Sequence, residues 1–244
     1  KAPVQDTERP LATETISEPS NPVVVLDQIT KLFGRFAALR EVSASFASGR
    51  LYAVLGENGA GKSTLLRIIA GLARPTRGRI TIFGSAHVQQ VLSRIGYMGH
   101  APLLYDEFSG VENLAYFGAL YSRQAASRSN IESAMHMVGL DPQLARRTSA
   151  YSQGMRQRLA LARATIHDPE LLLLDEPFSN VDVASTQAMA SLLGKLRDRG
   201  KTIFVVTHQA EILRTIADEN VVLQDGRLIS RSQSMNTAML EMSR

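Results

Sequence analysis

Three glycines, a lysine and a serine in residues 56–63 have the spacing of a phosphate-binding loop. The segment is Gly56-Glu57-Asn58-Gly59-Ala60-Gly61-Lys62-Ser63 and matches the pattern G-x-x-x-x-G-K-[ST]. Glycines let the backbone turn so that successive N–H groups point at an anion, next to the N-terminus of a following helix. Lys62 would then reach the β- and γ-phosphates of a nucleotide, and the Ser63 hydroxyl would bind Mg²⁺. The predicted nucleotide contacts are Gly56, Asn58, Gly59, Ala60, Gly61, Lys62, Ser63 and Thr64.

Two adjacent carboxylates, Asp175 and Glu176, follow a run of leucines at 171–174. Such a run is typical of a buried strand in a parallel sheet, and ligands bind beyond the carboxyl ends of these strands. We expect Asp175 to hold the Mg²⁺ shell and Glu176 to polarise an attacking water as the general base. The simpler alternative is an acidic strand end that caps the next helix.

A histidine, His208, follows Thr207 directly after the apolar residues 203–206. The strand at 202–206 is expected to lie beside the strand that ends at Asp175, so the imidazole would reach the same edge of the sheet. A lone histidine is more often structural. This position nevertheless favours a contact between His208 and the γ-phosphate, and a part in catalysis.

Short apolar strands alternate with helical segments on both sides of these residues. Strands are predicted at 23–26, 42–46, 51–55, 80–83, 95–98, 171–174 and 202–206, and helices at 65–72, 109–120, 130–138, 156–167 and 184–199. A hairpin is predicted at 221–229, around Asp225-Gly226. This alternation predicts an α/β fold with a mostly parallel sheet covered on both faces. The stretch 95–152 is mainly helical, and we expect it to be a subdomain inserted between two halves of one core.

Composition and charge exclude several other classes of protein. A hydrophobic content of 44% with 20% charged residues is ordinary for a globular chain of 244 residues. Lys and Arg outnumber Asp and Glu by only 27 to 23, and the two signs are interspersed, so no nucleic-acid partner is expected. Without cysteine, the chain has no disulfide or thiolate metal site. No stretch approaches the ~18 consecutive apolar residues of a membrane span, so a membrane would be reached only through partner subunits.

The two ends of the chain differ from its middle in composition. Residues 1–22 are rich in Pro, Thr, Ser and Glu and lack a hydrophobic period, which is typical of a disordered lead-in or a remnant of expression. We expect one ATP-binding domain at 23–232, with the helical subdomain at about 96–155 inserted in it. Residues 233–244 would form a separate C-terminal tail.

Two further motifs narrow the class. The segment Tyr151-Ser152-Gln153-Gly154-Met155 precedes the helix that leads to the Asp175 strand, and Ser179-Asn180-Val181-Asp182 follows Glu176. With these motifs the sequence resembles the ABC ATPase family along essentially its whole ordered length. The first motif is similar to the signature loop of that family and the second to its D-loop. The resemblance implies a P-loop core with a mostly parallel sheet, an N-terminal antiparallel β subdomain and an inserted α-helical subdomain.

The same resemblance implies how the chain works. The family binds Mg²⁺ and ATP between two head-to-tail subunits, so Ser152 and Gly154 would contact the γ-phosphate held by a partner subunit. Asp182 of the D-loop would also contact nucleotide. Phe33 would stack on adenine, unless it simply packs in the core. A homodimer, or a pair of cassettes, would attach to transmembrane permease subunits through the region 100–121. It would lie on the cytoplasmic face of the membrane and power export.

The signature loop departs from the usual family sequence. Gln153 replaces a glycine and Tyr151 a leucine, while Ser152 and Gly154 retain the groups that would contact phosphate. Exporters of drugs, sodium or polysaccharide carry a similar signature, so this motif does not name a cargo.

A second departure lies at Gly99-His100, where the family has a glutamine. Together with Leu104-Tyr105 it resembles the ATPase subunit of the cytochrome c maturation haem exporter. Imidazole is a poor substitute for the oxygen ligands that Mg²⁺ prefers. His100 would therefore act on the metal through a water, or would contact the permease instead.

Two alternatives remain in view. A non-transport ABC ATPase acting on nucleic acid or ribosomes is the first, although such relatives carry long coiled-coil insertions or two cassettes in one chain, and this sequence has neither. A small-molecule kinase with a P-loop is the second. The signature loop and residues 179–182 argue against it.

Overall fold

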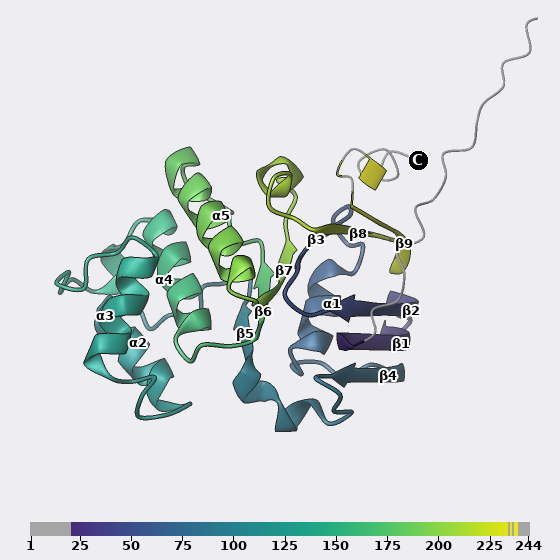
Figure 1. Cartoon of the computed structure of the whole chain (residues 1–244), viewed down its shortest axis with the longest axis horizontal. Coiled ribbons are helices and arrows are strands. Elements are labelled where there is room, and N and C mark those ends of the chain that lie inside the picture. Colours follow the sequence, from purple (N-terminus) through teal and green to yellow (C-terminus); the bar gives the residue numbers. More distant parts are fainter. Residues whose placement is uncertain (1–20, 234, 236, 239–244) are drawn as a thin grey trace, which may run out of the picture.

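Two sheets form the frame of the computed structural model, which describes residues 21–233, 235 and 237–238 (Figure 1). The larger sheet has the strand order β5-β6-β7-β3-β8-β9, in which all neighbours are parallel except the last pair. Its strands are β3 (Leu51–Leu55), β5 (Ile95–Met98), β6 (Leu171–Asp175), β7 (Thr202–Val206), β8 (Glu219–Gln224) and β9 (Arg227–Ser232). The predicted strands of the parallel sheet and the C-terminal hairpin are therefore confirmed.

The parallel strands divide their side chains between two hydrophobic cores. In β3, Leu51, Ala53 and Leu55 face one core while Tyr52 and Val54 face the other, and all are buried. The leucines of β6 divide in the same way. A strand covered on both faces needs an apolar side chain at every position. This explains the uninterrupted apolar runs in the sequence.

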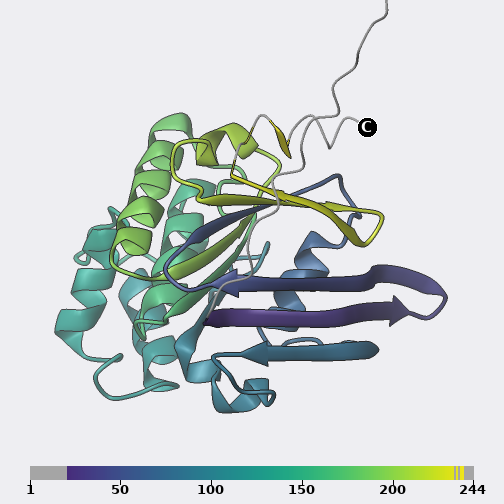
Figure 2. The same cartoon turned by 45° about the vertical axis from the view of Figure 1, so that its right-hand side comes forward.

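The smaller sheet is antiparallel, with the order β2-β1-β4, and Figure 2 shows its strands side by side. It consists of β1 (Pro22–Phe33), β2 (Phe36–Ala47) and β4 (Arg77–Ile82). The strands predicted at 23–26 and 42–46 are too short, because bulges interrupt the alternation of side chains. Gln28 and Glu41 have φ angles of 50° and 53°, and the register of β1 against β2 shifts between Leu26 and Ile29.

Helices cover both faces of the larger sheet. α1 (Lys62–Ile69) lies between the two sheets, where Leu65 and Ile69 share a core with residues of β1, β2 and β7. The other face carries α2 (Gly110–Ala119), α3 (Arg128–Met137), α4 (Gln153–Thr165) and α5 (Val183–Asp198), and the first three are grouped at one side in Figure 1. Short 3-10 turns lie at η1 (Val88–Gln90), η2 (Leu92–Arg94), η3 (Thr148–Ala150) and η4 (Ala210–Leu213). Within the described residues, no helix has the length and apolar character needed to cross a membrane.

Two helices begin about one turn earlier than predicted, because a polar motif forms their first turn. α1 starts at Lys62 and α4 at Gln153, each about one turn before the apolar period begins. α2 starts where its capping box predicts. The Ser109 hydroxyl accepts a hydrogen bond from the backbone N–H of Glu112 at 3.2 Å, and the Glu112 carboxylate accepts one from the N–H of Ser109 at 2.7 Å.

The expectations for the two ends of the chain lie mostly outside the described residues. β1 begins at Pro22 and β9 ends at Ser232. Beyond β9, Met235 and Ala238 are buried in the core that also contains residues of α5. At least this part of the C-terminal segment packs against the domain.

Candidate ATP site

Four neighbouring strands bring the predicted chemical residues to one edge of the larger sheet. His100 comes shortly after β5, Asp175 ends β6, His208 comes shortly after β7, and the loop at 56–61 follows β3. These strands are parallel and adjacent in the order β5-β6-β7-β3, so their carboxyl ends lie side by side. The expectation that the strand before His208 lies beside β6 is confirmed.

The loop between β3 and α1 depends on glycine at its turning points. Gly56, Gly59 and Gly61 have φ angles of 145°, 88° and 101°, which residues with a side chain rarely adopt. A Cβ at Gly61 would lie 2.4 Å from the carbonyl oxygen of Ala38, and one at Gly56 would lie 2.2 Å from that of Leu223. Gly61 is also the N-cap of α1, whose first turn has neither a side-chain cap nor an acidic residue. The first N–H groups of α1 are therefore available to an anion.

Lys62 is folded into this loop. Its ammonium group donates hydrogen bonds to the carbonyl oxygens of Gly56 at 2.7 Å and Glu57 at 2.8 Å, and the residue is 7% exposed. Burial lowers the pKa of Lys62, while the carboxylates of Glu176 and Asp175 act in the opposite direction. A cation that is shielded from water and lies beside a helix N-terminus attracts phosphate oxygens more strongly than an exposed lysine does.

Ser63 and Asp175 meet at the start of α1. The Ser63 hydroxyl donates a hydrogen bond to Asp175 Oδ1 at 2.9 Å, and Asp175 is 1% exposed. Burial raises the pKa of the Asp175 carboxyl group, and the hydrogen bond from Ser63 opposes this shift. A carboxylate and a hydroxyl are hard oxygen donors, and Mg²⁺ commonly takes one or two such ligands while keeping waters and phosphate oxygens. The pair therefore fits the predicted Mg²⁺ site.

Glu176 and His208 form a pair at the next position along the edge. Nδ1 of His208 lies 2.9 Å from Oε2 of Glu176, and the backbone N–H of His208 donates to the same oxygen at 3.4 Å. The glutamate side chain is 15% exposed and the histidine side chain 61%. Glu176 also has a φ angle of 55°, and its N–H donates to the carbonyl oxygen of Val206 at 2.9 Å. Contacts to β7 and its following residues thus fix both the backbone and the carboxylate of Glu176.

A cavity of about 510 Å³ lies at this edge of the sheet. Its walls contain most of the predicted site residues: Phe33, Asn58, Gly59, Gly61, Lys62, Ser63, Thr64, His100, Asp175, Glu176 and His208. Gly56 and Ala60 belong to the loop but not to the wall, and Ala60 is only 5% exposed. The structure therefore gathers one phosphate-binding loop, the two adjacent carboxylates and two histidines around a single space.

His100 reaches this space from β5, the strand next to β6. His100 is exposed and lines the cavity together with Asp175. A positive charge on His100 would lower the pKa of the Asp175 carboxyl group. The preceding Gly99 packs against Tyr97, since a Cβ at Gly99 would lie 3.2 Å from the tyrosine ring. His100 thus lies at the cavity. A water-mediated role at the metal stays a prediction, as does a contact with the permease.

Two exposed aromatic rings form the outer wall of the cavity. Phe33 is 55% exposed and Phe36 is 60% exposed, and they pair directly across the turn between β1 and β2. This exposure argues against plain core packing of Phe33. Phe36 and Ser179 also line the cavity but were not predicted. The signal for Phe36 was its place directly after the Gly34-Arg35 turn, opposite Phe33.

Ser152, Gly154 and Asp182 form a second group, which is not part of the cavity wall. Ser152 caps α4 by accepting a hydrogen bond from the N–H of Met155 at 3.2 Å. Asp182 caps α5 by accepting one from the N–H of Ser185 at 2.9 Å. A Cβ at Gly154 would lie 3.7 Å from Oδ2 of Asp182, so the two motifs are neighbours. Asp182, and not Asp175 or Glu176, caps the helix after β6. This finding contradicts the simpler alternative, in which Asp175 or Glu176 would only cap the next helix.

Comparison with known proteins agrees with this architecture. Residues 39–179 match the family model described as "ABC transporter". Over 199 residues the chain is 38% identical to the ABC transporter ATP-binding protein NatA of Bacillus subtilis (strain 168), a match that covers 80% of this chain and 81% of that protein. It is 35% identical over 211 residues to the bacitracin transport ATP-binding protein BcrA of Enterococcus faecalis, covering 85% of this chain and 68% of that protein.

A solved structure shows the same likeness in three dimensions. It is the dimeric post-hydrolysis state of the ATP-binding cassette MJ0796 bound to ADP and Pi, with a TM-score of 0.80 and 28% sequence identity. The alignment covers 86% of this chain and 98% of that one. The antiparallel sheet, the parallel core and the inserted helices of the present chain are thus arranged as in that cassette.

Proposed function

The chain belongs to the ABC transporter family as an ATP-binding and ATP-hydrolysing subunit, and we propose that it powers export through separate transmembrane subunits. One observation carries the proposal: a single cavity brings together Lys62, Asp175, Glu176 and His208. Together they supply a cation for phosphate, a metal ligand, a general base and an imidazole that orients the base.

ATP would bind with its phosphates in the loop and its base against the exposed rings. The N–H groups at the start of α1 and the Lys62 ammonium would bind the β- and γ-phosphates. Phe33 and Phe36 would offer their ring faces to adenine at the mouth of the cavity. The rings lie on β1 and β2 and the loop follows β3, so base and phosphates would be held by different sheets.

Mg²⁺ fits the oxygen pair of Ser63 and Asp175, which would hold it beside the phosphates. The ion would neutralise negative charge on the β- and γ-phosphate oxygens. Asp175 suits the role of metal ligand because its carboxylate lies at the end of a buried strand. Its side chain already has little conformational freedom there, so binding the ion would cost little further entropy.

Hydrolysis would begin with a water positioned by Glu176. The carboxylate would accept a proton from that water as the water attacks the γ-phosphorus, the bond from that phosphorus to the β,γ-bridging oxygen breaks, and ADP leaves with that oxygen. His208 contacts Oε2 of Glu176 and lines the same cavity, which supports the proposal that its ring contacts the γ-phosphate. Lys62 and the loop N–H groups would stabilise the charge on the transferred phosphoryl oxygens.

The second group of predicted contacts implies a dimer. Ser152 and Gly154 lie at the N-terminus of α4, away from the cavity wall of their own chain. A two-fold dimer would place that helix N-terminus against the γ-phosphate held by the other subunit. Each nucleotide would then be closed in by the loop of one subunit and the signature of its partner.

The permease would dock on the exposed aromatic side chains beside α2. We call Tyr105, Phe108, Tyr116 and Phe117 the aromatic cluster, since their rings contact one another with centroids 4.9–6.4 Å apart. Tyr105 and Tyr116 are each 43% exposed, and the nearby Leu103 and Leu120 are 58% and 67% exposed. Exposed apolar side chains gathered in one place are typical of a protein interface. A membrane subunit would thereby hold this chain at the inner face of the membrane.

The cargo is proposed on narrower grounds. The Gly99-His100 motif supports haem export for cytochrome c maturation, and the Tyr151-Ser152-Gln153 sequence supports export more generally. The cargo would be contacted by the membrane subunits. Purification of the chain with its native membrane partner, followed by identification of that partner, tests this level of the proposal. The alternative of a non-transport ABC ATPase has no observation in its favour, and NatA and BcrA are named as ATP-binding proteins of transport systems.

The Glu176→Gln substitution tests the catalytic assignment. It keeps the size and polarity of the side chain but removes the basic oxygen, so single-turnover hydrolysis should fall about 10²–10⁴-fold. ATP affinity should be retained, because the loop and the aromatic wall are unchanged. Glu132→Gln, on α3 and away from the cavity, is the matched control. Near-normal hydrolysis by the Glu176→Gln protein would contradict the assignment.

A further inference from the structure

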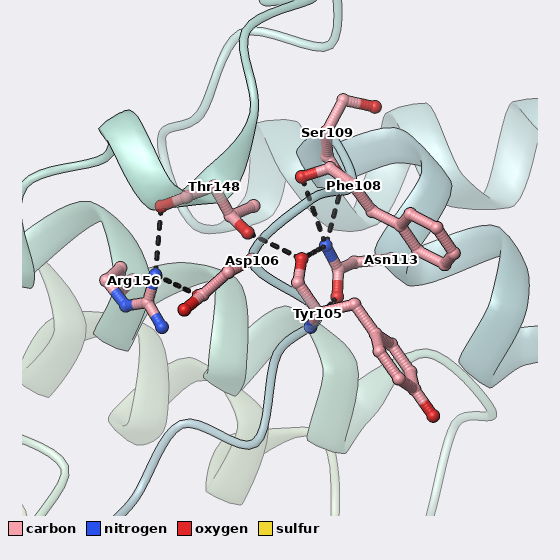
Figure 3. Close-up of polar contacts among 7 residues, drawn as sticks. All are labelled: Tyr105, Asp106, Phe108, Ser109, Asn113, Thr148 and Arg156. Carbon is pink, nitrogen blue, oxygen red and sulfur yellow. Dashed lines mark hydrogen bonds and ion pairs between the residues drawn. The ribbon is translucent and has the colours of Figure 1, made fainter.

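The segment 105–109 between β5 and α2 is closed into a tight turn by one buried asparagine (Figure 3). Asn113 is fully buried, and its amide donates to the carbonyl oxygens of Tyr105 and Ser109, each at 3.0 Å. Its Oδ1 accepts from the N–H of Tyr105 at 2.8 Å. A side chain that satisfies both ends of a turn leaves that turn little freedom to change shape.

The same segment is bonded to the residues just before the signature loop. The Thr148 hydroxyl donates to the carbonyl oxygen of Tyr105 at 2.8 Å, and the Thr148 N–H donates to that of Phe108 at 2.8 Å. The N–H of Ser149 donates to the carbonyl oxygen of Asp106 at 3.0 Å. Thr148 is fully buried, so no water competes for its two hydrogen bonds.

A third connection comes from the first turn of the signature helix. Arg156 lies in α4, where its N–H donates to the carbonyl oxygen of Ser152 at 2.9 Å. Its guanidinium contacts Asp106 Oδ1 at 2.6 Å and donates to the carbonyl oxygen of Thr148 at 3.0 Å. The arginine side chain is 19% exposed and the aspartate 55%. One guanidinium thus connects the turn, the residues before the signature and the helix that follows it.

The turn also carries part of the aromatic cluster. Tyr105 contacts Tyr116 and Phe117 of α2, and Phe108 contacts Tyr116. One short segment is therefore held against the signature by polar contacts and presents the exposed ring of Tyr105 to the exterior.

We propose that Asp106, Thr148 and Arg156 are positioning residues that make the turn at 105–109 a rigid extension of the signature helix. Closure of the ATP site at Ser152 then displaces the aromatic cluster, and docking at the cluster biases closure in return. The inference rests on the proposed function, which places Ser152 at a partner's nucleotide and the cluster at a permease. Coupling of this kind is reciprocal, because each event changes the free energy of the other by the same amount.

Hydrogen–deuterium exchange of the full chain tests this connection. In the Glu176→Gln background, ATP should hold the closed dimer, whose fraction is measured by size-exclusion chromatography. ATP should then slow amide exchange both at 147–156 and at 105–109, relative to ADP. Adding Asp106→Asn and Thr148→Val should leave the response at 147–156 but reduce that at 105–109 by about fivefold or more.

Two further variants keep the result interpretable. Asp106→Asn alone changes an exposed side chain and should give a smaller reduction of about twofold at 105–109. Glu107→Gln removes the neighbouring carboxylate, which forms no ion pair among the described residues, and should keep the full response. Failure of ATP to form any dimer would overturn the proposed function, and this inference with it. A dimer whose response at 105–109 is unchanged in the double variant would overturn this inference alone.

Discussion

His100 follows β5, the strand next to the one that ends at Asp175, and both residues line the cavity. Imidazole changes its charge near neutral pH, unlike the amide of a glutamine. A protonated ring beside Mg²⁺ would repel the ion, whereas a neutral ring could bind one of its waters. Replacing His100 by glutamine therefore distinguishes a role in metal binding from a role at the surface.

The His100→Gln substitution should bind Mg²⁺ and ATP at least as well as wild type. Half-maximal ATPase activity should require no more Mg²⁺ than in wild type, because an amide oxygen suits Mg²⁺ better than an imidazole nitrogen does. Magnesium titrations of ATP binding and of ATPase rate in both proteins measure the two effects. His136→Gln, an exposed histidine on α3, serves as the control. Identical profiles for wild type and His100→Gln would show that His100 takes no part at the site.

Residues in the phosphate loop and at the strand ends could be predicted because each role fixes a residue type at a fixed spacing. Lys62, Asp175 and His208 follow this logic, and the structure places them around one cavity. Phe36 was missed because an exposed aromatic residue shows its role only through what it faces. The contact between His208 and Glu176 also required the structure, because sequence gives the strand end but not the direction of a side chain.

Among the helices and strands, α4 and β5 meet at a half-buried histidine. His167 follows α4, and its Nε2 lies 3.1 Å from the carbonyl oxygen of Ile95 in β5. Its ring stacks on Tyr121 with centroids 3.7 Å apart and an interplanar angle of 2°. Nδ1 is buried and has no hydrogen-bond partner, so a proton on that nitrogen would be left without an acceptor. Burial lowers the pKa of His167 below its ordinary value.

This environment makes the stability of the domain depend on pH. The unfolded chain binds a proton at His167 near pH 6.5, whereas the folded chain resists protonation to lower pH. The contribution of neutral His167 to the free energy of unfolding should therefore be fully present above about pH 6.5 and should decline as the pH falls below that value. The melting temperature should fall less between pH 7.5 and 5.5 in His167→Phe, which keeps a ring against Tyr121, than in wild type. An equal fall in both proteins, or a reduced fall in His136→Gln, would contradict this account.

The order of strands and helices could largely be predicted, because buried parallel strands and capped helices leave local patterns. β3 and β6 are examples of the first, and α2 of the second. The full lengths of β1 and β2 could not be predicted, since their bulges at Gln28 and Glu41 break the alternation. The pairing order of the strands could not be predicted either, because it depends on contacts between distant segments that a local sequence pattern does not reveal.

At the scale of the whole molecule, the predicted nucleotide contacts fall into two groups, of which only one lines the cavity. The cavity wall holds Lys62 and Glu176, while Ser152 and Gly154 lie at the start of α4 beside Asp182. A dimer with two-fold symmetry is the simplest assembly that completes both sites at once. The central claim is therefore that Ser152 acts on the nucleotide of the partner subunit.

Mixing two inactive proteins tests this claim most directly. Lys62→Ala removes from one subunit the ammonium group that would bind phosphate. Ser152→Ala removes the signature hydroxyl from the other subunit. Loss of one such group costs about 10²-fold or more in rate. A mixed dimer would hold one doubly defective site and one intact site, because each site takes one group from each subunit. With two different affinity tags to verify mixing, an equimolar mixture should recover about a quarter of the wild-type ATPase rate, since half of the dimers are mixed and each has one intact site. A verified mixed dimer no more active than its two parents would contradict the account.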